Sequence, residues 1–462
     1  MRGTHKRHSN LTKTLLNNGE KAMAKTLSLG VSRAIITPEV GGNLMGYSPD
    51  IISYEIHDDL VADVYYFKEG DTQALLVSAS VGVIGESIAK EIRLEIEKEY
   101  GIPNECCMIH ATHTHSAPIL IHSPGWGEPD FPYINFVLRP RLLKAVGEAI
   151  KSAEPVTVAT AKGESIIASN RRELTLDNEI ILGQCPWGPF DPTMTLISFM
   201  NGDNKIVATL VHYTMHGTAS GPNHEVTRDW SGVMVDTIEE NIGGMSSFIN
   251  GAIGDVGPRM PAGTTKGGYV NGKFCANASY AVQIGSVAAQ DAMRIVKNMT
   301  GYKEAHLSIL PFDYEMPLLP RIPLETAKRE LEKYAGNTVN IAAGKAGYYK
   351  RVVDSYESGF VEKQTLPKSG AVIKIGDIAI VCTQFELFSE IGMRISGASN
   401  LPYTVVLSNV NGSGSYIPSE GEICRGGYEV EMFKTGYIQP YRNSADFYII
   451  TESLARIEEI CK

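Results

Sequence analysis

Two histidines in the run ATHTHS (111–116) have the type and spacing that most directly indicate chemistry. His113 and His115 are two positions apart, at the end of an expected strand over 106–115. Residues two apart on a strand point to the same face, so one imidazole can bind a metal ion while the other works beside it. The alternative is that one or both are polar strand-end residues held by hydrogen bonds. The pair indicates a zinc site anchored on His113.

Three further residues of the types that bind zinc follow apolar runs elsewhere in the chain: His216, Glu386 and Tyr416. In α/β sheets, binding sites collect beyond the carboxyl ends of the strands, so these side chains are expected at the same edge as His113. His212 lies four positions before His216, a spacing that resembles HExxH. No glutamate lies between them, however, and the surroundings favour a strand, so only one of the two needs to be a ligand.

Two acidic residues, Glu386 and Asp255, also have simpler interpretations. Glu386 and Glu390 are four apart, and that spacing would stack them on one helix face as a solvated pair. Asp255 lies in the glycine-rich run 250–259, where tight turns explain the glycines as well as a close backbone approach does. The chain contains no GxSxG, no GxxxxGK[ST], and no GxGxxG that follows a strand and opens a helix. Nucleophile-elbow, phosphate-loop and dinucleotide-binding chemistry are therefore not indicated.

The elements that must position these residues form three similar units, each with a strand, a helix and a second strand. The helix over 87–100 carries isoleucines every fourth residue, which is typical of a helix with one buried face. In this first unit the connection is far too long for a hairpin, so its two strands should be parallel. The predicted fold class is α/β, with mixed or parallel sheets covered by helices. The units are 74–84, 87–100 and 106–115; 205–215, 230–242 and 246–253; and 378–383, 388–396 and 403–410.

The composition is that of a folded globular protein, with 43% hydrophobic and 20% charged residues in a chain of 462. We expect a single domain over 27–462, with 1–26 as a disordered tail or an artificial extension. Glu- and Lys-rich sequence over 325–357 predicts helices packed outside. The net charge of −10 is spread along the chain, which argues against nucleic acid as a partner because phosphate binding needs a basic face.

Location is predicted from what the sequence does not contain. No stretch reaches the about 18 continuous apolar residues that span a bilayer, and the N-terminal residues lack the apolar core of a secretory signal. The seven cysteines are odd in number and form no CxxC pair, so neither a disulfide framework nor a thiolate zinc cluster is expected. These features predict a cytoplasmic protein without a transmembrane segment. They leave open whether the chain forms a homo-oligomer.

Motifs along nearly the whole chain resemble those of the neutral/alkaline, non-lysosomal ceramidases and their shorter bacterial relatives. The most specific match is ATHTHSAP (111–118), which is similar to the family's ATHTHSGP. The remaining matches occur in the family's order: GVSRAIITPEVGGNLMGY (30–47), HDDL (57–60), NRR (170–172), HGTASGPNHEVTRDWSG (216–232), NGAIGDVGPR (250–259), FELFSEIG (385–392) and GSYIPSEGEICRGGYE (414–429). The resemblance implies the ceramidase catalytic-domain fold without the C-terminal immunoglobulin-like domain of the longer members.

The resemblance also implies one catalytic zinc ion, bound by two histidines, a glutamate and a tyrosine. Carried over position by position, these ligands are His113, His216, Glu386 and Tyr416. The alignment selects His216 over His212 because only His216 precedes the matching Gly-Thr and Gly-Pro run.

The resemblance gives supporting catalytic roles to His115, Arg171 and Tyr428. Two positions depart from the family pattern. A serine of the GDVSPR element is Gly257 here, and a tyrosine often found just before the zinc tyrosine corresponds to Ser413. These departures concern the surroundings of the expected site rather than its metal ligands.

The expected reaction is a hydrolysis in which a water activated by zinc attacks a carbonyl carbon. His115 would pass the proton to the leaving group, while Arg171 and Tyr428 stabilise the oxyanion. The predicted substrate is a small or lipid-like molecule with a non-peptide amide bond, and an ester or lactone is the alternative. A non-catalytic relative that binds zinc or a ligand is a second alternative, and a purely structural metal site is a third. The loop over 119–135, with Trp126, is either a lid or a packed surface loop.

Overall fold

The strands of the largest sheet alternate apolar side chains between two buried faces, and this pattern builds the fold around a central layer. The computed structural model describes residues 26–259, 264–265, 269–270, 273–274, 278–338 and 340–462. The expected tail over 1–26 therefore lies outside the described residues except for its last one. In spatial order the sheet contains β12 (Met245–Asn250), β10 (Ile206–Tyr213), β9 (Thr193–Asn201), β6 (Glu154–Glu164), β1 (Ser28–Ile35), β3 (Val61–Glu69), β4 (Thr72–Ala79) and β5 (Cys107–Ala111).

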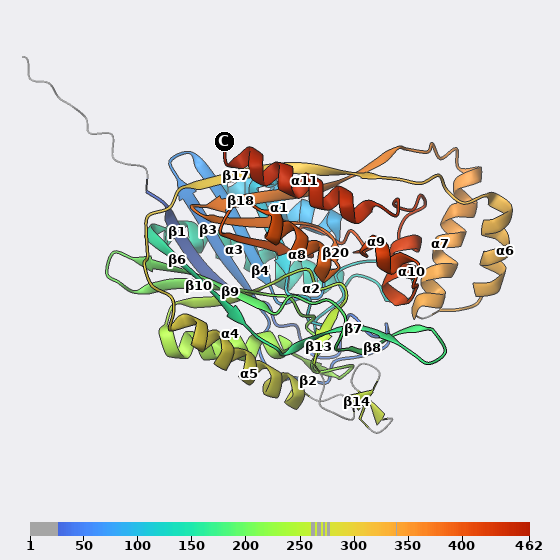
Figure 1. The fold of residues 1–462 in the computed structure, drawn as a ribbon, viewed down its shortest axis with the longest axis horizontal. Coiled ribbons are helices and arrows are strands. Elements are labelled where there is room, and N and C mark those ends of the chain that lie inside the picture. The colour runs from blue at the N-terminus through green and yellow to red at the C-terminus, as the bar shows by residue number, and fades with distance from the viewer. Residues whose placement is uncertain (1–25, 260–263, 266–268, 271–272, 275–277, 339) are drawn as a thin grey trace, which may run out of the picture.

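A four-stranded sheet lies against one face of the large sheet (Figure 1). Residues of both sheets, such as Phe67 and Leu210 from one and Ile373 and Leu407 from the other, share one buried apolar cluster. The order of the four strands is β17 (Leu307–Pro317), β18 (Thr365–Ile375), β19 (Ile378–Cys382) and β21 (Tyr403–Leu407).

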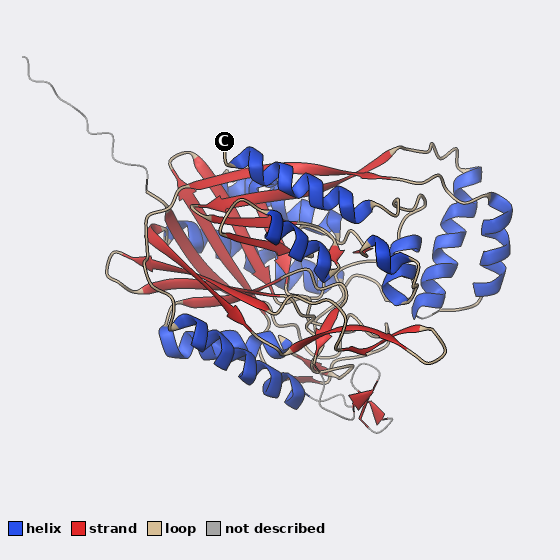
Figure 2. Cartoon of the chain, in the orientation of Figure 1, coloured by secondary structure: helices blue, strands red, loops and turns tan. Residues whose placement is uncertain are grey.

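Helices cover the two outer faces, so the fold has four layers, helix–sheet–sheet–helix (Figure 2). On the large sheet, α1 (Glu86–Tyr100) and α3 (Arg139–Lys151) pack over β3 and β4. Two more, α4 (Asp229–Ile242) and α5 (Ala278–Val296), pack over β9 and β10. The outer face of the smaller sheet is covered by α8 (Ser389–Ala398) and α11 (Ala445–Ile460). The α/β prediction with helix-covered mixed sheets is confirmed.

Each of the three strand–helix–strand units predicted from the sequence is present, and each supplies one parallel strand pair. These pairs are β4 with β5, β10 with β12, and β19 with β21, whereas the other pairings in the two sheets are antiparallel. The parallel pairs lie at the sheet edges, so the large sheet carries one at each end of its strand order.

The large sheet bends so that its two edge strands meet. Strands β1 and β6 pair over only two positions, at Ser28 and Leu29, which leaves the two halves of the sheet free to turn towards each other. As a result β12 reaches β5: the side-chain amide of Asn250 donates to the Ala111 carbonyl at 2.9 Å, and its backbone N–H donates to His110 Nε2 at 3.1 Å. The carboxyl ends of two units thus come together.

Shorter elements connect the strands and helices of these layers. Among them are the pairs β2 (Glu55–Ile56) with β11 (Glu225–Val226) and β20 (Glu386–Leu387) with β22 (Tyr416–Ile417). Two three-stranded sheets are β13 (Val256–Pro258), β7 (Ala168–Leu174) and β8 (Ile180–Cys185), and β14 (Thr264–Thr265), β15 (Tyr269–Val270) and β16 (Lys273–Phe274). The short helices are α2 (Phe131–Tyr133), α9 (Glu420–Ile423) and α10 (Tyr428–Thr435), a 3₁₀ turn over Asn104–Cys106 and a π turn over Ile134–Leu138.

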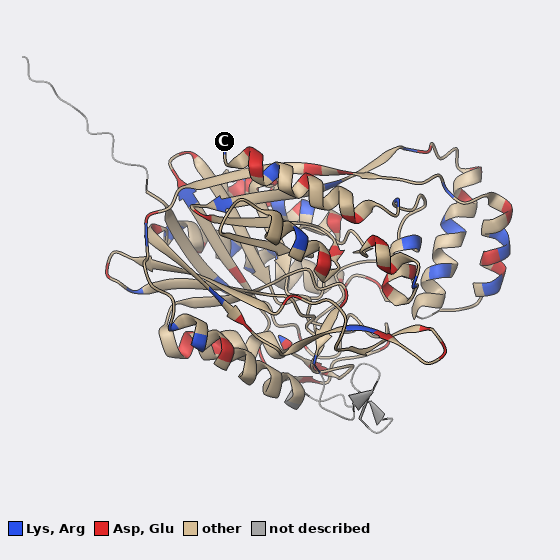
Figure 3. Ribbon diagram, viewed as in Figure 1, with Lys and Arg blue, Asp and Glu red and all other residues tan. Residues whose placement is uncertain are grey.

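Two outer helices, α6 (Leu324–Tyr334) and α7 (Asn340–Glu357), pack against each other beside the sheets (Figure 1). They fall where outer helices were predicted. None of the helices in the described part of the chain combines the length and the apolar character needed to cross a membrane. Basic and acidic residues are interspersed along the ribbon (Figure 3), in keeping with the spread of charge seen in the sequence.

Candidate metal centre

His113 lies beyond the end of a strand, in a backbone conformation that the sequence did not reveal. Strand β5 ends at Ala111, and His113 has a φ of 67°, in the left-handed region that few residues with a side chain adopt. The expectation that the strand continues through His113 and His115 is therefore wrong. The His113 Nδ1 atom lies 2.7 Å from the Gly82 carbonyl oxygen. Because a carbonyl only accepts hydrogen bonds, Nδ1 carries the proton and the lone pair is on Nε2.

His216 is held in the same way from the neighbouring unit. It follows β10, its side chain is completely buried, and its Nδ1 lies 3.0 Å from the Val256 carbonyl oxygen. The indole N–H of Trp230 donates to the His216 carbonyl at 3.0 Å and fixes the backbone. The Nε2 atom of His216 therefore also presents a lone pair. His212, in contrast, is a buried strand residue whose Nε2 faces the Val406 carbonyl, which agrees with the choice of His216.

Glu386 belongs to a strand and not to a helix. It pairs with Tyr416 in the parallel contact between β20 and β22, and α8 begins only at Ser389. The interpretation of Glu386 and Glu390 as a solvated pair on one helix face is thus wrong. Glu390 forms an exposed ion pair with Arg394, whereas Glu386 is buried, with 8% of its surface exposed.

Three ligand atoms converge beyond the strand ends. The Glu386 Oε2 atom lies 3.5 Å from His113 Nε2 and 3.5 Å from His216 Nε2. Two atoms bound to one tetrahedral zinc ion at about 2.1 Å lie about 3.4 Å apart, so this spacing fits the ion. Among the described residues, His216 Nε2 and Glu386 Oε2 are buried without a hydrogen-bond partner. Buried polar atoms are rarely left unpaired, and a metal ion would satisfy both.

His115 lies against the same centre but is held differently. Its Nε2 atom is 3.2 Å from His113 Nε2, and with His113 and His216 it forms a three-histidine cluster whose ligand atoms lie within 4.8 Å of one another. Distance alone therefore admits His115 as a ligand. However, its Nδ1 atom is buried without a hydrogen-bond partner in the described structure, so no carbonyl fixes its tautomer. Its ring packs edge-on against Tyr47, with centroids 5.0 Å apart.

The protonation states around the centre are those of metal ligands. Burial lowers the pKa of His216 to about 3, and Arg171 adds to this effect. Burial and the neighbouring His113 also lower the pKa of His115 well below its usual value. For Glu386, burial opposes ionisation, but His113 and His216 outweigh it and lower the carboxyl pKa to about 2. At neutral pH, His115 and His216 are neutral and Glu386 is ionised, as metal binding requires.

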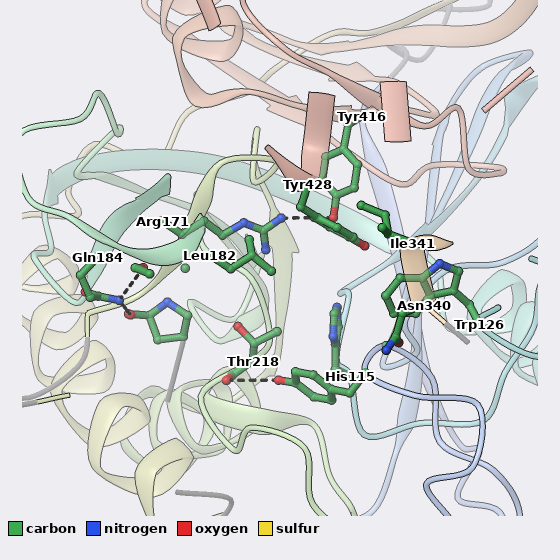
Figure 4. Close-up of a pocket in the computed structure, with 15 residues that line it drawn as sticks. His115, Trp126, Arg171, Leu182, Gln184, Thr218, Asn340, Ile341, Tyr416 and Tyr428 are labelled. Atoms are coloured by element: carbon green, nitrogen blue, oxygen red, sulfur yellow. Dashed lines mark hydrogen bonds between the residues drawn. The ribbon is translucent and has the colours of Figure 1, made fainter. Parts of the chain in front are cut away.

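Arg171 reaches the centre because the strand that carries it is irregular. The pairing of β7 with β8 shifts register between Asn170 and Arg172, which re-aims the side chain between them. An Arg171 guanidinium N–H donates to the Tyr416 hydroxyl at 3.2 Å, and another donates to Glu429 at 2.9 Å. The sequence-predicted Arg171 and Tyr416 are therefore in direct contact (Figure 4).

Tyr428 completes the set at the first residue of α10. Its ring packs edge-on against Tyr416, with centroids 5.7 Å apart, and against Trp126, with centroids 6.0 Å apart. Burial raises the pKa of the Tyr428 hydroxyl, so the group stays protonated and can donate a hydrogen bond. All seven residues named from the sequence thus surround one place in the structure.

Sequence reasoning missed the residues that hold these side chains. Arg172 is buried with 1% exposure and donates to Glu429 at 2.7 Å and to Glu422 at 2.8 Å. Glu429 therefore accepts from two adjacent arginines, and this ties β7 to α10. From the sequence, the glycine-rich run around Asp255 was explained equally well by tight turns. In the structure Asp255 is buried and accepts hydrogen bonds from Asn170 and Ser389. Burial raises its pKa to about 7.

A cavity of about 340 Å³ opens beside the centre (Figure 4). Its polar wall includes Arg171, Gln184 and Thr218. Its apolar wall includes Leu182, from the β7–β8 hairpin, and Ile341, from α7. A second cavity, of about 100 Å³, lies over His113 and Glu386. Trp126 borders both cavities, so the loop over 119–135 forms part of the wall.

Comparison with known proteins shows similarity to solved ceramidase structures. Over 94% of this chain, the structure matches that of a neutral ceramidase from Pseudomonas aeruginosa, with a TM-score of 0.71 and 17% sequence identity, covering 75% of that chain. A ceramidase complexed with C2 matches over 94% of this chain and 76% of its own, with a TM-score of 0.69 and 17% identity. No protein-family model and no curated protein sequence matches. The chain therefore has a neutral ceramidase-like fold.

Proposed function

We propose that the protein is a zinc-dependent hydrolase that cleaves a non-peptide amide. One observation carries the proposal: His113 Nε2, His216 Nε2 and Glu386 Oε2 converge at the spacing of zinc ligands beside an open cavity. The fold shared with ceramidase structures supports the amide as the bond that is cleaved. The single domain and the cytoplasmic location stay predictions from the sequence.

His113, His216 and Glu386 would hold the zinc ion, with Tyr416 as the fourth ligand. A bound zinc ion would lower the pKa of a water molecule towards about 7 and so supply a nucleophile. Two neutral imidazoles and one carboxylate also leave a net positive charge on the centre, which favours a developing anion. Tyr416 pairs with Glu386 across β20 and β22, so the Tyr416 hydroxyl lies on the same side of the centre as the Glu386 carboxylate.

His115 is the group suited to move the proton. It borders both cavities, whereas His216 lines neither, and a neutral imidazole can accept a proton from the attacking water. His115 then gives the proton to the nitrogen of the leaving amine, because breaking the C–N bond requires protonation of that nitrogen. No backbone carbonyl holds its Nδ1 in the described structure, in contrast to His113 and His216.

Arg171 and Tyr428 would stabilise the negative charge that develops on the carbonyl oxygen. Arg171 is held by Glu429 and by Tyr416, and Tyr428 is a protonated donor on the same wall. Donors that are fixed before the reaction stabilise the oxyanion without reorganisation, which is the usual source of their effect. Gly257 stands where the family has a serine and supplies no hydroxyl at its own position, so Arg171 and Tyr428 carry the role here.

The test combines metal content with turnover. The purified protein is assayed for zinc by mass spectrometry and for hydrolysis of a matched panel of N-acyl amines, esters and lactones. We expect about one zinc ion per chain and turnover of amides, lost on chelation and restored by zinc. If only esters or lactones are hydrolysed, the bond cleaved is an ester or lactone and the proposed amide is wrong. Stoichiometric zinc without turnover on any substrate would identify a binding protein.

A further inference from the structure

A single turn contacts both of the chain segments that carry the histidines of the centre. The turn comprises residues 227–230 (TRDW), where α4 begins, and we call it the clamp turn. We call 113–116 the first histidine segment and 216–220 the second. Asp229 in the turn is only 2% exposed, so its contacts lie inside the molecule.

The clamp turn holds the first histidine segment on both sides of His115. The backbone N–H of Thr227 donates to the Ser116 carbonyl at 3.1 Å, and the Thr227 carbonyl accepts from the Thr114 hydroxyl at 2.8 Å. Thr114 and Ser116 are each 1% exposed, so water does not compete for these hydrogen bonds. The residues before and after His115 are thus fixed to one residue of the turn.

The clamp turn holds the second histidine segment through Trp230 and Asp229. The Trp230 indole donates to the His216 carbonyl. The two carboxylate oxygens of Asp229 accept from the backbone N–H groups of Ala219 and Ser220, at 2.9 and 2.8 Å, and the first of these oxygens also accepts from the Trp230 N–H. Burial raises the pKa of Asp229, and these three hydrogen bonds oppose that shift. Both segments are therefore tied to one turn.

The clamp turn has an unusual backbone conformation at Asp229. This residue has a φ of 59°, in the left-handed region that few residues with a side chain adopt. Such conformations persist where the surrounding contacts hold them, and they collect at functional sites. The Asp229 backbone N–H donates to the Thr227 hydroxyl at 3.0 Å. The turn is therefore held in shape by its own side chains as well as by the two segments.

His115 depends on these contacts more than the candidate metal ligands do. The rings of His113 and His216 are fixed by backbone carbonyls, whereas no carbonyl holds the His115 Nδ1 atom in the described structure. The backbone N–H of His115 donates to the Gly217 carbonyl at 3.1 Å, within the second segment. The backbone of His115 is therefore positioned by both segments.

The ring of His115 packs against residues that also meet the second segment. Tyr47 lies edge-on to this ring, with centroids 5.0 Å apart, and the Tyr47 hydroxyl donates to the Thr218 carbonyl at 3.5 Å (Figure 4). A Cβ added at Gly46 would lie 2.3 Å from His115 Nδ1, so the ring is packed closely against this backbone. A shift of the second segment would therefore displace His115 through its backbone and through its ring.

We propose that the clamp turn positions His115 for proton transfer, with Asp229 as the positioning residue. This inference rests on the proposed hydrolase function, in which His115 moves the proton. Asp229 borders neither cavity and acts by holding the backbone at Ala219 and Ser220. A carboxylate is required there because both of its oxygens accept from backbone N–H groups, whereas an asparagine would turn an NH₂ group towards one of them.

The first experiment compares Asp229→Asn with the parent protein. Asparagine adopts the left-handed conformation as aspartate does, so the exchange alters the hydrogen bonds and keeps the backbone preference. We expect kcat to fall by about 10–100-fold, because a displacement of about 1 Å can cost that much, while zinc content and KM change little. Unchanged kcat would overturn the proposal. If Asp229→Asn does not fold, Thr114→Val, which removes the hydroxyl bonded to the Thr227 carbonyl, replaces it in every measurement.

Asp446→Asn is the matched control. Asp446, at the start of α11, is 3% exposed, and its two oxygens accept from the backbone N–H groups of Glu420 and Phe447, at 2.8 and 2.7 Å. It therefore has the same kind of buried hydrogen bonds as Asp229, on a different helix. Both variants should unfold at a lower temperature, and only Asp229→Asn should lose kcat. Equal losses of kcat would assign the effect to stability and overturn the proposal.

A double-mutant cycle tests whether Asp229 acts through His115. In His115→Ala the group that moves the proton is absent, so adding Asp229→Asn should lower the residual turnover by less than about twofold. If the two substitutions instead multiply their full effects, Asp229 acts on another part of the site and the proposal is wrong.

Crystal structures with zinc bound separate this inference from the hydrolase function. In Asp229→Asn we expect the His115 ring to move by about 0.5–1 Å relative to His113 and His216. A displaced His115 in a protein without turnover would support the positioning role and contradict the hydrolase. Turnover with His115 in place and kcat unchanged in the variant would support the hydrolase and contradict the positioning role.

Discussion

The floor and the rim of the candidate site are built in different ways. His113, His216 and Glu386 form the floor, with exposures of 2%, 0% and 8%, and the two imidazoles are fixed by backbone carbonyls. The rim comes from a loop, a hairpin and an outer helix. Leu182 on that rim is 40% exposed, and Trp187, just beyond the end of β8, is 95% exposed.

This difference separates chemistry from selectivity. Each floor residue follows a strand that is buried on both faces. The positions of these residues are therefore fixed by the packed cores of the two sheets. Changing them should alter metal binding together with turnover. The rim residues supply no candidate ligand atom to the metal, so changing them should alter which substrate is used and leave the metal in place. Substitutions in the two regions therefore give distinguishable results.

The largest effect is expected from a change in the floor. Glu386→Gln keeps the shape of the side chain but removes the charge, leaving two imidazoles and a neutral amide as ligands. We expect loss of bound zinc and a fall in kcat/KM of about a thousandfold or more, which corresponds to about 4 kcal/mol. Zinc analysis and kinetics on the same preparation measure both. Full zinc content with normal kinetics would exclude Glu386 as a ligand.

His115→Ala tests the division of work between the two histidines of ATHTHS. If His115 moves protons, turnover falls by about 10²–10⁴-fold while zinc content stays near that of the parent protein. Circular dichroism controls for folding. Loss of zinc in this variant would instead favour the three-histidine cluster as the ligand set. Retained activity would point to a structural metal site.

A smaller effect is expected at Tyr428, on the cavity wall that carries the hydrogen-bond donors. Tyr428→Phe removes one hydroxyl that can donate to the developing oxyanion, and losses for one such donor are about 10²–10³-fold in kcat. KM and zinc content should change little, because the ring still packs against Trp126 and Tyr416. A rise in KM at constant kcat would show that Tyr428 binds substrate without stabilising the transition state.

The smallest effect is expected at Gly257. A side chain added there meets Arg171 at 3.7 Å, an ordinary contact, so Gly257→Ser should change stability by less than about 0.5 kcal/mol. Gly217→Ser is the matched control on the floor. An added Cβ there lies 2.8 Å from the His113 carbonyl oxygen, so this variant should unfold at a lower temperature and bind zinc less well. Equal behaviour of the two variants would contradict the difference in the room around the two glycines.

Several parts of the fold and of the site could be read from the sequence for local reasons. The helix period at 87–100 and the apolar runs around it depend only on neighbouring residues, and the structure has α1, β4 and β5 in those places. In α/β sheets, binding residues lie at the carboxyl ends of the strands in many otherwise different folds. The residues ending such strands could therefore be nominated before their contacts were known.

Other features could not be predicted because they depend on contacts between distant segments. The positive φ of His113 is held by the loop after β4, where the Val81 and Gly82 carbonyls accept its backbone and ring hydrogen bonds. The residues next to Glu386 in the sequence suit a helix as well as a strand. Glu386 is extended because it pairs with Tyr416, thirty residues later. Glu429 pairs with Arg171 and Arg172 across more than 250 positions.

The sequence by itself determined the element types, the parallel units and the set of residues able to bind a metal. Only the tertiary structure decided how those residues meet. The two edge strands of the large sheet join because the sheet bends at the short β1–β6 contact, and this brings His216 to His113. The physical reason is that periodicity and turn chemistry act over a few residues, whereas the position of one strand end relative to another is set by packing between whole layers.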